Sequence, residues 1–297
     1  MSPTLSVIIP VFNGRATIKK AVDSVLSQTM SDYELIVVDD ASTDDTDEII
    51  NSIGSSRISV IRHASNRGAA AARNTGIKAA RGHWIAFLDA DDSWPPGKLE
   101  RQFNALTRSP RRFVASVTGF ALHKEGRSTP VYLHIEPENV RREILFGCAV
   151  SPGSTLMIER SVYDEVGLLD DNMRRLEDWD WLLRFSKQHS LLCIAEPLAD
   201  IYVAGGSAAG SERREAAVIK AIELIESRHL PRLASSRERR QLRSSLLVER
   251  AASHYRRGEH FLAAYLTARA FSVYPIRNAA FFSSLSRVIQ SRFRKSQ

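Results

Sequence analysis

Through the first third of the chain, short apolar runs alternate with stretches in which apolar residues return every three or four positions. Short apolar runs closed by turn-forming residues are typical of buried strands, and the other spacing is typical of amphipathic helices. We expect strands over residues 5–9, 35–38, 58–61 and 84–88. We expect helices over residues 16–28, 42–53, 68–80 and 95–106. This alternation predicts an α/β fold with a doubly wound, mostly parallel sheet.

Two of these helices carry start signals of their own. Ser42 is followed three residues later by Asp45, a spacing that predicts a capping box. Pro95 suits the first turn of the helix that we expect to end near Leu106, because proline has the helical φ already and its missing amide is not needed there.

The pattern is more mixed after residue 112. We expect strands over residues 113–122, 155–159, 191–195 and 198–203, and a helix over residues 177–186. The stretch Gly205–Ser211 has the composition of a linker, and the chain beyond it is predicted to be helical to about Arg294. We therefore expect two domains, residues 1–205 with the sheet and a basic helical region over residues 206–297.

Two stretches of the helical region have apolar residues at helical spacing. They predict a helical hairpin that packs on itself or on the first domain. The apolar positions are Leu246, Leu247, Ala251 and Tyr255 in one helix, and Phe261, Ala264, Tyr265 and Ala268 in the other.

Composition fits a globular protein without a membrane span. The chain has 297 residues, with 43% hydrophobic and 25% charged residues. No apolar run approaches the ~18 residues of a spanning helix, and the N-terminus lacks the pattern of a signal peptide. Cys148 and Cys193 form no disulfide framework, and we interpret them as core thiols in a reducing compartment. These features together predict a cytoplasmic protein.

The net charge of +7 is unevenly distributed. Residues 206–297 hold 18 Lys and Arg against 7 Asp and Glu, which leaves the rest of the chain with 23 against 27. From Pro275 onward there are five basic residues and no acidic one, mixed with apolar residues. Such a segment suits the surface of an anionic membrane, so we expect peripheral attachment at the inner face. A docked helix with a solvated basic face is the alternative.

Polar side chains follow three of the expected strands directly. They are Asn13, then Asp39 with Asp40, then Asp89 with Asp91. Right-handed crossovers place the carboxyl ends of parallel strands at one edge of the sheet, where ligands bind in open α/β folds. Two carboxylates one residue apart, such as Asp89 and Asp91, suit Mg²⁺ or Mn²⁺. A solvated acidic turn, or caps of the following helices, fit the same residues.

A small-residue stretch precedes and opens the expected helix over residues 68–80. Gly68 lets a backbone approach a ligand, and a helix N-terminus with Arg67 and Arg73 nearby suits phosphate. A plain Ala-rich buried helix with solvated arginines is the alternative. There is no Gly-x-Gly-x-x-Gly after the first strand and no Walker A loop, which argues against an NAD enzyme and a P-loop NTPase.

Acidic residues also gather at the start of the helix expected over residues 177–186. Glu177 and Asp178 stand beside Trp179 and Trp181. A carboxylate in a partly desolvated cleft walled by tryptophan suits a general base. The helix dipole alone also favours carboxylates at a first turn.

In order along the chain, five motifs resemble those of the family 2 glycosyltransferases, which have the GT-A fold. They are Val7–Asn13, Val37–Asp44, Asn66–Gly68 with Ala72–Gly76, Phe87–Asp92, and Glu177-Asp178 followed by Leu183-Arg184. The resemblance covers about residues 3–205. Relatives with a His after the last strand can reach the metal through it, but residues 201–206 contain no His. A third protein ligand is therefore left open.

The resemblance implies a role for each matching residue. Asp89 and Asp91 are expected to meet a Mn²⁺ or Mg²⁺ ion and the diphosphate. Asp178 is expected to be the catalytic base, with Glu177 preceding it. The residues expected around the nucleotide are Pro10, Val11, Asn13, Asp39, Asp40, Arg67, Gly68, Arg73, Asp89 and Ala90.

The implied activity is inverting transfer of a sugar from a nucleoside-diphosphate sugar, with uridine as the expected base. The acceptor would be a hydroxyl of a glycan or lipid-linked molecule, in cell-surface polysaccharide biosynthesis. A nucleotidyltransferase is an alternative, although the segment Phe12-Asn13-Gly14 supplies little of the loop it needs. A basic nucleic-acid-binding protein would interleave aromatic with basic residues, and few such pairs are evident, so no nucleic-acid partner is expected. A catalytically dead member of the family would not need the full carboxylate set.

Overall fold

The computed structural model describes residues 2–147, 152–203 and 212–275. The predicted linker Gly205–Ser211, the part of the predicted helical region beyond residue 275 and Cys148 lie outside the described residues.

The chain divides into two compact units. The first, which we call the sheet unit, comprises Met1–Val140, Val150–Asn172 and Arg184–Gly205. The second, which we call the helical unit, comprises Arg141–Ala149, Met173–Leu183 and Gly206–Gln297. The helical unit thus includes two segments that precede the predicted domain boundary at residue 205.

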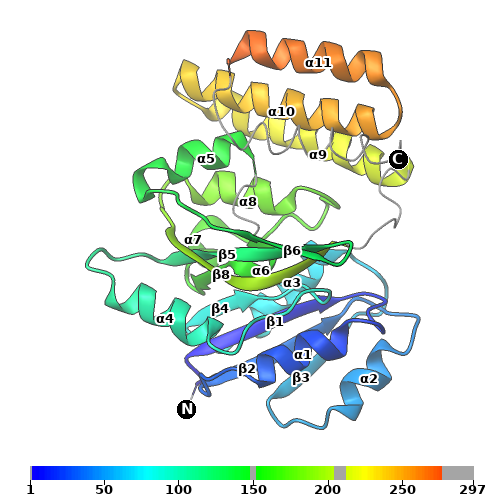
Figure 1. Cartoon of the computed structure of the whole chain (residues 1–297), viewed down its shortest axis with the longest axis vertical. Coiled ribbons are helices and arrows are strands. Elements are labelled where there is room, and N and C mark those ends of the chain that lie inside the picture. The colour runs from blue at the N-terminus through cyan, green and yellow to red at the C-terminus, as the bar shows by residue number, and fades with distance from the viewer. Residues whose placement is uncertain (1, 148–151, 204–211, 276–297) are drawn as a thin grey trace. The chain divides into compact units, whose positions relative to one another are not determined.

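The sheet unit is built on an eight-stranded sheet (Figure 1). Its first half is parallel and has the order β3 (Ile58–Arg62), β2 (Tyr33–Asp39), β1 (Leu5–Val11), β4 (Trp84–Phe87). Strands β2, β1 and β4 are rich in apolar residues because both of their faces are covered, whereas β3, at the edge, is largely exposed. The expected α/β class and the doubly wound arrangement are confirmed.

The second half of the sheet is mostly antiparallel. It consists of β7 (Met157–Glu159), β5 (Ala115–Lys124), β6 (Arg127–Val131) and β8 (Leu192–Val203). The prediction of two strands around Pro197 was wrong: β8 is one strand, parallel to β5, and its register shifts beside Gly119. A side chain at Gly119 would come within 2.5 Å of the carbonyl oxygen of Ala195, so the irregular pairing needs glycine there.

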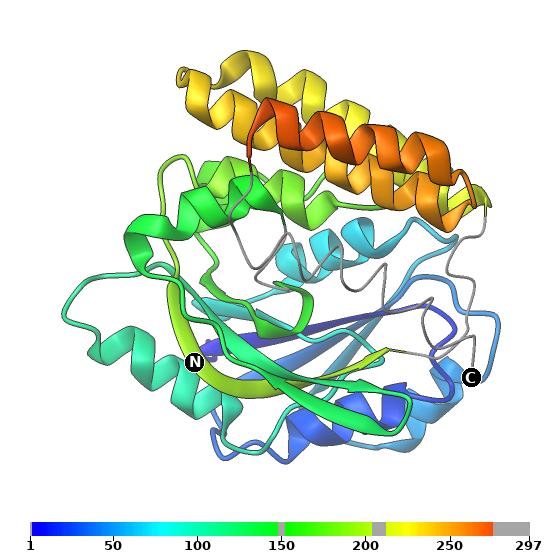
Figure 2. The same cartoon turned by 45° about the horizontal axis from the view of Figure 1, so that its top comes forward.

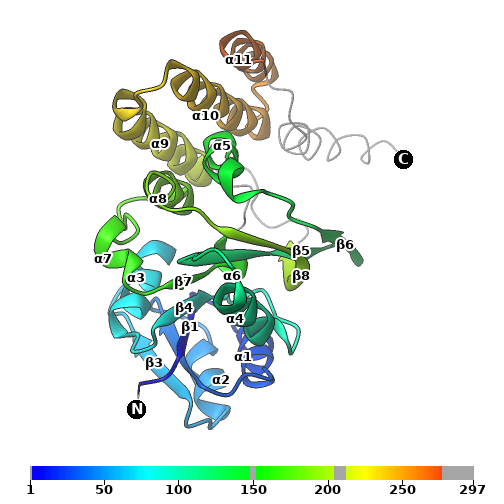
Figure 3. The same ribbon diagram turned by 90° about the vertical axis from the view of Figure 1, so that its left-hand side faces the viewer.

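Helices cover both faces of the parallel strands (Figure 3). On one face, α1 (Ile18–Leu26), α2 (Thr46–Ser52) and α4 (Lys98–Arg108) pack on the main apolar core. On the other face lies α3 (Ala69–Ala79). Gly76 lets α3 approach the sheet closely, because a Cβ there would lie 2.4 Å from the Ile8 side chain.

Two predicted helix starts were wrong. The capping box does not form: α2 begins at Thr46, and the Ser42 hydroxyl instead accepts a hydrogen bond from the Asn13 amide, 29 residues away in sequence (2.9 Å). The helix after β4 begins at Lys98, because Pro95 stands in a turn whose carbonyl accepts from the Lys98 amide (3.1 Å).

Several short elements were not predicted. They are β6, the 3₁₀ turn η1 (Pro137–Asn139), α5 (Val140–Phe146), α6 (Pro152–Thr155) and α7 (Val162–Val166). The predicted helix over residues 177–186 is α8 (Glu177–Phe185).

The helical unit contains three longer helices, α9 (Glu212–His229), α10 (Ser236–Arg256) and α11 (His260–Val273), with the 3₁₀ turn η2 (Leu230–Arg232) after α9. Helix α10 lies between α9 and α11 (Figures 1 and 3). Buried polar contacts join them: the Ser244 hydroxyl donates to the Ala270 carbonyl (2.8 Å), and Arg256 on α10 pairs with Glu215 on α9 (2.8 Å).

The other segments of this unit are tied in by long-range polar contacts. Arg141 pairs with Glu238 on α10 (2.6 Å), and the Trp179 indole donates to the Ile144 carbonyl (2.6 Å). His229, at the end of α9, contacts the buried Asp180 carboxylate of α8 (2.9 Å). Helix α8 is therefore part of the packing of the helical unit over most of its length.

The predicted hairpin of α10 and α11 forms, but the expected packing face of α11 was wrong. Leu246 and Ala251 of α10 are buried as expected. In α11 the buried residues are Ala263, Leu266 and Ala270. The expected set, Phe261, Ala264, Tyr265 and Ala268, is exposed. Helix α11 is apolar on both sides, so spacing alone could not identify the buried side.

Candidate active site

The parallel strands β3, β2, β1 and β4 bring their carboxyl ends to one edge of the sheet. The strand order reverses direction at β1, which has β2 on one side and β4 on the other. In open α/β sheets, ligands bind outside the carboxyl ends of the strands at such a switch point. The polar residues predicted for the site within the sheet unit follow β1, β2 and β4.

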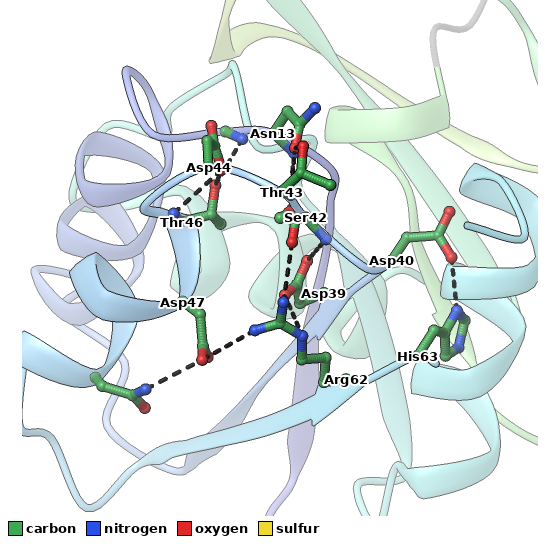
Figure 4. Close-up of polar contacts among 12 residues, drawn as sticks. Asn13, Asp39, Asp40, Ser42, Thr43, Asp44, Thr46, Asp47, Arg62 and His63 are labelled. Atoms are coloured by element: carbon green, nitrogen blue, oxygen red, sulfur yellow. Dashed lines mark hydrogen bonds and ion pairs between the residues drawn. The ribbon is translucent and has the colours of Figure 1, made fainter. Parts of the chain in front are cut away.

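After β1, the chain turns sharply at Asn13, whose φ is 53°. The Asn13 side-chain oxygen accepts a hydrogen bond from the Thr43 amide (2.8 Å), so the loops after β1 and β2 are bonded together (Figure 4). Pro10 and Val11 are buried within β1. Phe12 is 48% exposed beside them and offers an aromatic face at this edge.

Asp39 ends β2 and is fully buried. Its Oδ1 accepts from the Ser42 amide (2.9 Å), and its Oδ2 lies 3.5 Å from Nε of Arg62 (Figure 4). This pairing holds the intervening Ala41 at a φ of 64°, a conformation that non-glycine residues rarely adopt. The buried carboxylate of Asp39 therefore fixes the backbone conformation of the loop after β2.

Asp40 points the other way, toward the loop that precedes α3 (Figure 4). Its Oδ1 lies 2.6 Å from Nδ1 of His63 and accepts from the Arg67 amide (2.8 Å). Its Oδ2 accepts from the Gly68 amide (2.6 Å), where the chain has a φ of 93°. His63 is itself bonded to the Thr75 hydroxyl on α3 (2.9 Å). Asp40 thus fixes the turn that carries Arg67 and Gly68.

Asp89 follows β4 and is paired with α3. Its Oδ1 lies 2.6 Å from a guanidinium nitrogen of Arg73, and its amide donates to the Ser154 hydroxyl (3.1 Å). A Cβ on Gly153 would lie 2.3 Å from Asp89 Oδ2, so the backbone of α6 lies directly against this carboxylate. The structure thus brings Arg73 and Asp89, both predicted site residues, together as an ion pair.

The two carboxyl groups that follow have raised proton affinity. Burial, with the negative charge of Asp89 added, raises the pKa of Asp91. The same causes raise the pKa of Asp92 to about 7. Asp92 is held by the Ser154 hydroxyl (2.5 Å) and the Tyr202 amide (3.0 Å). Asp92 is therefore part of the support beneath the Asp89–Asp91 turn.

Asp89 and Asp91 fit a divalent ion as a partial ligand set. They supply hard carboxylate oxygens. Burial, and after it the charge of Asp89, disfavours the charged form of Asp91, and a bound cation would favour it. Within the described residues no cluster of three or more His, Cys, Asp or Glu side chains is arranged to hold a metal. A donor diphosphate and water would have to complete the shell around Mn²⁺ or Mg²⁺.

Arg67 extends from the turn held by Asp40. Its side chain is 54% exposed and lies 3.5 Å from the Asp171 carboxylate. Arg73, one turn into α3, has a side chain only 12% exposed. The two arginines therefore differ: Arg73 is positioned by Asp89, whereas Arg67 reaches solvent.

Glu177 and Asp178 belong to the helical unit, where they begin α8. Leu176 precedes them with a φ of 59°, and Asp178 Oδ1 accepts from the amide of Trp179 (2.7 Å). Asp178 is half-buried. The tryptophans were expected to wall a cleft, and this was wrong: Trp179 and Trp181 are buried, and the Trp179 indole is bonded within the unit.

Sequence reasoning missed several residues of this edge. His63 contacts the carboxylate of Asp40, and Arg62 lies beside that of Asp39. The Ser154 hydroxyl accepts from the Asp89 backbone amide and donates to the Asp92 carboxylate. Phe12 is exposed at the same edge. His63 directly follows β3, so its position at the same sheet edge was a usable signal. Ser154 had none, since it comes from a helix 65 residues beyond Asp89.

The fold resembles solved glycosyltransferase structures across the chain. TarS 1–349 of S. aureus, in complex with UDP, matches with a TM-score of 0.64 and 17% identity, covering 100% of this chain and 92% of that one. Mannosyltransferase PcManGT of Pyrobaculum calidifontis, in complex with GDP-Man and Mn²⁺, matches at 0.60 and 16%, covering 100% and 83%. The fold is that of the GT-A glycosyltransferases.

Sequence comparison places the chain more narrowly. Residues 6–167 match the family model described as glycosyl transferase family 2. The chain belongs to this family, which confirms the expected class of enzyme.

Individual relatives agree with that assignment. A glycosyltransferase of Haemophilus influenzae is 32% identical over 65% of this chain and 66% of its own. TuaG of Bacillus subtilis, named for teichuronic acid biosynthesis, is 32% identical over 72% and 84%. WfaP of Escherichia coli, named as a UDP-Glc:α-D-GlcNAc-diphosphoundecaprenol β-1,3-glucosyltransferase, is 38% identical over 53% and 61%. The chain thus spans just under two thirds of the first and last of these relatives.

The helices of the described residues are short or polar by the standard of a membrane span. None of them is both long and apolar enough to cross a membrane.

Proposed function

We propose that the protein transfers a sugar, with inversion, from a nucleoside-diphosphate sugar to a hydroxyl of a glycan or lipid-linked acceptor. The observation that carries the proposal is the shared sheet edge. There, Asn13, Asp39, Asp40 and the Asp89–Asp91 turn follow adjacent parallel strands at the switch point beside β1.

The nucleoside would lie at the ends of β1 and β2. Phe12 offers an exposed aromatic face, and Asn13 and the loop after Asp39 supply polar groups around it. Pro10 and Val11 form the floor beneath them, and Asp40 contributes by fixing the turn of Arg67 and Gly68. In this arrangement Phe12 and Asn13 would contact the base, whereas Asp39 and Asp40 would position the loops around it.

The diphosphate would lie at the end of β4, where Arg73 supplies positive charge beside Asp89 and Ala90. Asp89 and Asp91 would hold Mn²⁺ or Mg²⁺, which when bound offsets the charge that grows on the departing diphosphate. Arg73 adds a guanidinium to the same side, in the fixed orientation that its ion pair with Asp89 imposes.

Asp178 is the proposed general base, with Glu177 beside it. Its carboxylate would remove the proton from the acceptor hydroxyl as the sugar carbon becomes oxocarbenium-like. A single displacement of this kind inverts the anomeric centre. Because Asp178 Oδ1 accepts from the Trp179 amide, the first turn of α8 would orient the carboxylate.

The relatives support a donor and an acceptor class. TarS has been solved with UDP and with UDP-GlcNAc, and WfaP is named for a UDP-glucose donor and a diphosphoundecaprenol acceptor. We therefore propose a UDP-sugar donor and a lipid-linked acceptor, in the synthesis of a cell-surface polysaccharide. This acceptor would require the enzyme to work at the inner face of a membrane.

A donor panel tests the proposal. The full chain is incubated with UDP-, GDP- and dTDP-sugars, a diphosphoundecaprenol saccharide, and Mn²⁺ or Mg²⁺, and nucleoside diphosphate release is measured. We expect release with a UDP-sugar and none with Asp91→Ala, while Asp23→Ala on the α1 surface retains activity. The anomeric configuration of the product, read by NMR, should be opposite to that of the donor. No release with any donor would overturn the proposed transfer, and retention would overturn the single displacement.

A further inference from the structure

The side of α11 that faces away from α10 is apolar and exposed. Phe261 is 96% exposed, Tyr265 57% and Leu262 41%. Ala264 and Ala268 are exposed between them. Together these five residues form what we call the outer face of α11. We propose that this face binds the surface of an anionic lipid bilayer.

The outer face is not a by-product of how α11 packs. The inner residues Ala263, Leu266 and Ala270 are buried, and α10 is the main packing partner of α11 (Figure 2). A helix that packs on one side ordinarily has polar residues on the other. Here Phe261 and Tyr265, about one turn apart, and Leu262, next to Phe261, carry large apolar side chains instead. Contiguous exposed apolar residues of this kind mark an interaction surface.

The charges on the outer face and at its C-terminal end are basic, and Glu259, the acidic residue that precedes α11, is paired with Arg257 (3.0 Å) and His254. Helix α11 contains Arg269 and no acidic residue, and Arg269 lies over the Tyr265 ring with its guanidinium carbon 5.8 Å from the ring centroid. Arg237, at the start of α10, donates to the Tyr274 hydroxyl just beyond α11 (3.4 Å). Arg240, one turn before Ser244 and its contact with α11, is also exposed. Aromatic side chains mixed with arginine suit the headgroup region of anionic lipid.

The chain that follows α11 has the same character. Helix α11 ends at Val273, and from Pro275 to the last residue the sequence has five basic residues and no acidic one. A basic segment joined directly to a basic, aromatic helix face adds to the attraction of an anionic surface. A second copy of this chain fits less well, because the outer face offers no carboxylate to pair with Arg269. These features together favour a membrane over a protein partner.

The inference concerns where the proposed transferase works, since a lipid-linked acceptor lies in a membrane, and it rests on the proposed function in that respect alone. Binding to vesicles and sugar transfer are measured separately. Either can therefore fail without the other.

Co-sedimentation of the full chain with vesicles tests the proposal. The vesicles contain phosphatidylcholine alone or phosphatidylcholine with phosphatidylglycerol. We expect binding only with phosphatidylglycerol, and an affinity about tenfold lower for Phe261→Ser/Tyr265→Ser, equivalent to about 1.4 kcal/mol. The matched control is Tyr132→Ser, directly after β6, because Tyr132 has the same exposed fraction, 57%, as Tyr265. Tyr132→Ser should bind as the unmodified chain does.

A second variant reads insertion directly. The four native tryptophans, Trp84, Trp94, Trp179 and Trp181, are all buried. The indole introduced by Phe261→Trp would therefore be the exposed one, and brominated lipid should quench it upon binding. Absence of quenching, or equal binding of the double variant and the unmodified chain, would overturn the proposal. Equal affinity for vesicles with and without phosphatidylglycerol would also overturn it. The same holds if the double variant changes the oligomeric state of the protein and leaves vesicle binding unchanged.

The variants also separate this inference from the proposed function. With a water-soluble acceptor analogue, the double variant should transfer sugar at the unmodified rate. Vesicle binding without any sugar transfer would leave the surface standing and remove the proposed activity.

Discussion

Buried carboxylates serve different partners in the two units. In the sheet unit, Asp39 and Asp40 accept hydrogen bonds from the backbone amides of Ser42, Arg67 and Gly68. In the helical unit, Glu215 and Asp180 pair with side chains on other helices.

The partners decide what each carboxylate can do. A carboxylate bound to backbone amides fixes a loop in a conformation that the loop would rarely adopt alone, as the positive φ of Ala41 shows. A carboxylate bound to an arginine on a neighbouring helix, such as Glu215 with Arg256, fixes the packing of two helices. The first arrangement builds a binding edge and the second builds a framework.

The largest expected effect tests whether the helical unit is only a framework. Asp178→Asn should lower sugar transfer by about 10²–10⁴-fold, the usual contribution of a positioned base. The melting temperature and the donor affinity should stay close to the unmodified values, because asparagine retains the oxygen that accepts from the Trp179 amide. Single-turnover transfer, donor binding and thermal unfolding measure the three quantities.

The matched control for this variant is Asp23→Asn, on the exposed surface of α1, which should leave transfer unchanged. Near-normal transfer by Asp178→Asn would remove the base from Asp178. A large loss of stability instead would place Asp178 with the framework carboxylates.

The next effect concerns the framework itself. Glu215 is fully buried and accepts from Arg256 (2.8 and 3.0 Å) and from the Ser253 hydroxyl (2.6 Å). Glu215→Gln should lower the free energy of unfolding by about 3 kcal/mol, because breaking such a pair leaves a charge with reduced compensation. Glu226→Gln, which removes an exposed partner of Arg250, should change it by less than about 0.5 kcal/mol.

The same pair sets a pH dependence. Burial acts to raise the pKa of Glu215. The hydrogen bonds from Arg256 and Ser253, together with the positive charge of Arg256, outweigh it, so the pKa lies below its usual 4.5. The stability from this group is thus present above pH 4.5 and is lost as the pH falls through the lowered pKa. Urea unfolding between pH 3 and 7 should show a smaller acid loss in Glu215→Gln; an identical loss would contradict this account.

The sequence predicts the carboxylates of the sheet edge better than those that pair helices, and the reason is physical. The strand-end carboxylates Asp39, Asp40 and Asp89 were recognised because short apolar runs end directly at them, and the carboxyl ends of parallel strands share an edge. Their supports were harder to find. Ser42 was interpreted as a local cap, whereas its hydroxyl binds a loop 29 residues away.

The framework left almost no signal in the sequence. Glu215 and Arg256 are 41 residues apart, and Asp180 and His229 are 49 apart, with nothing at either position to indicate a partner. Helix α11 shows the limit of periodicity, because its residues have apolar spacing on both sides. Only three-dimensional packing selects Ala263, Leu266 and Ala270 as the buried set.

A smaller effect sharpens the role of backbone-bound carboxylates. Asp40→Asn leaves one side-chain oxygen for three donors: His63 and the amides of Arg67 and Gly68. We expect a loss of about 2 kcal/mol, because at least one part-buried donor is left without its acceptor. The turn before α3 should also loosen, so the KM for the donor should rise while Glu215→Gln leaves it unchanged. Calorimetric unfolding and donor titration check both; a stability loss with an unchanged KM would confine Asp40 to the framework class.

The smallest effect comes from a cation that belongs to neither arrangement. Lys98 is fully buried at the start of α4, its amine lies 3.8 Å from the Trp94 ring centroid, and it has no hydrogen-bond partner among the described residues. Burial holds the pKa of this amine well below its usual 10.5. Because the folded pKa lies below the unfolded one, lowering the pH through this range favours the unfolded chain, and raising it restores stability.

Lys98→Met, which keeps the volume and removes the charge, should therefore stabilise the protein by about 1 kcal/mol at neutral pH. It should also flatten the rise in stability toward pH 10, whereas Lys19→Met, at an exposed position of α1, should do neither. A Lys98→Met variant less stable than the unmodified chain would contradict this account. The Trp94 ring would then have to stabilise the amine more strongly than water does. Lys98 would in that case stabilise the fold by a contact of a third kind, beside the backbone-bound and the helix-pairing carboxylates.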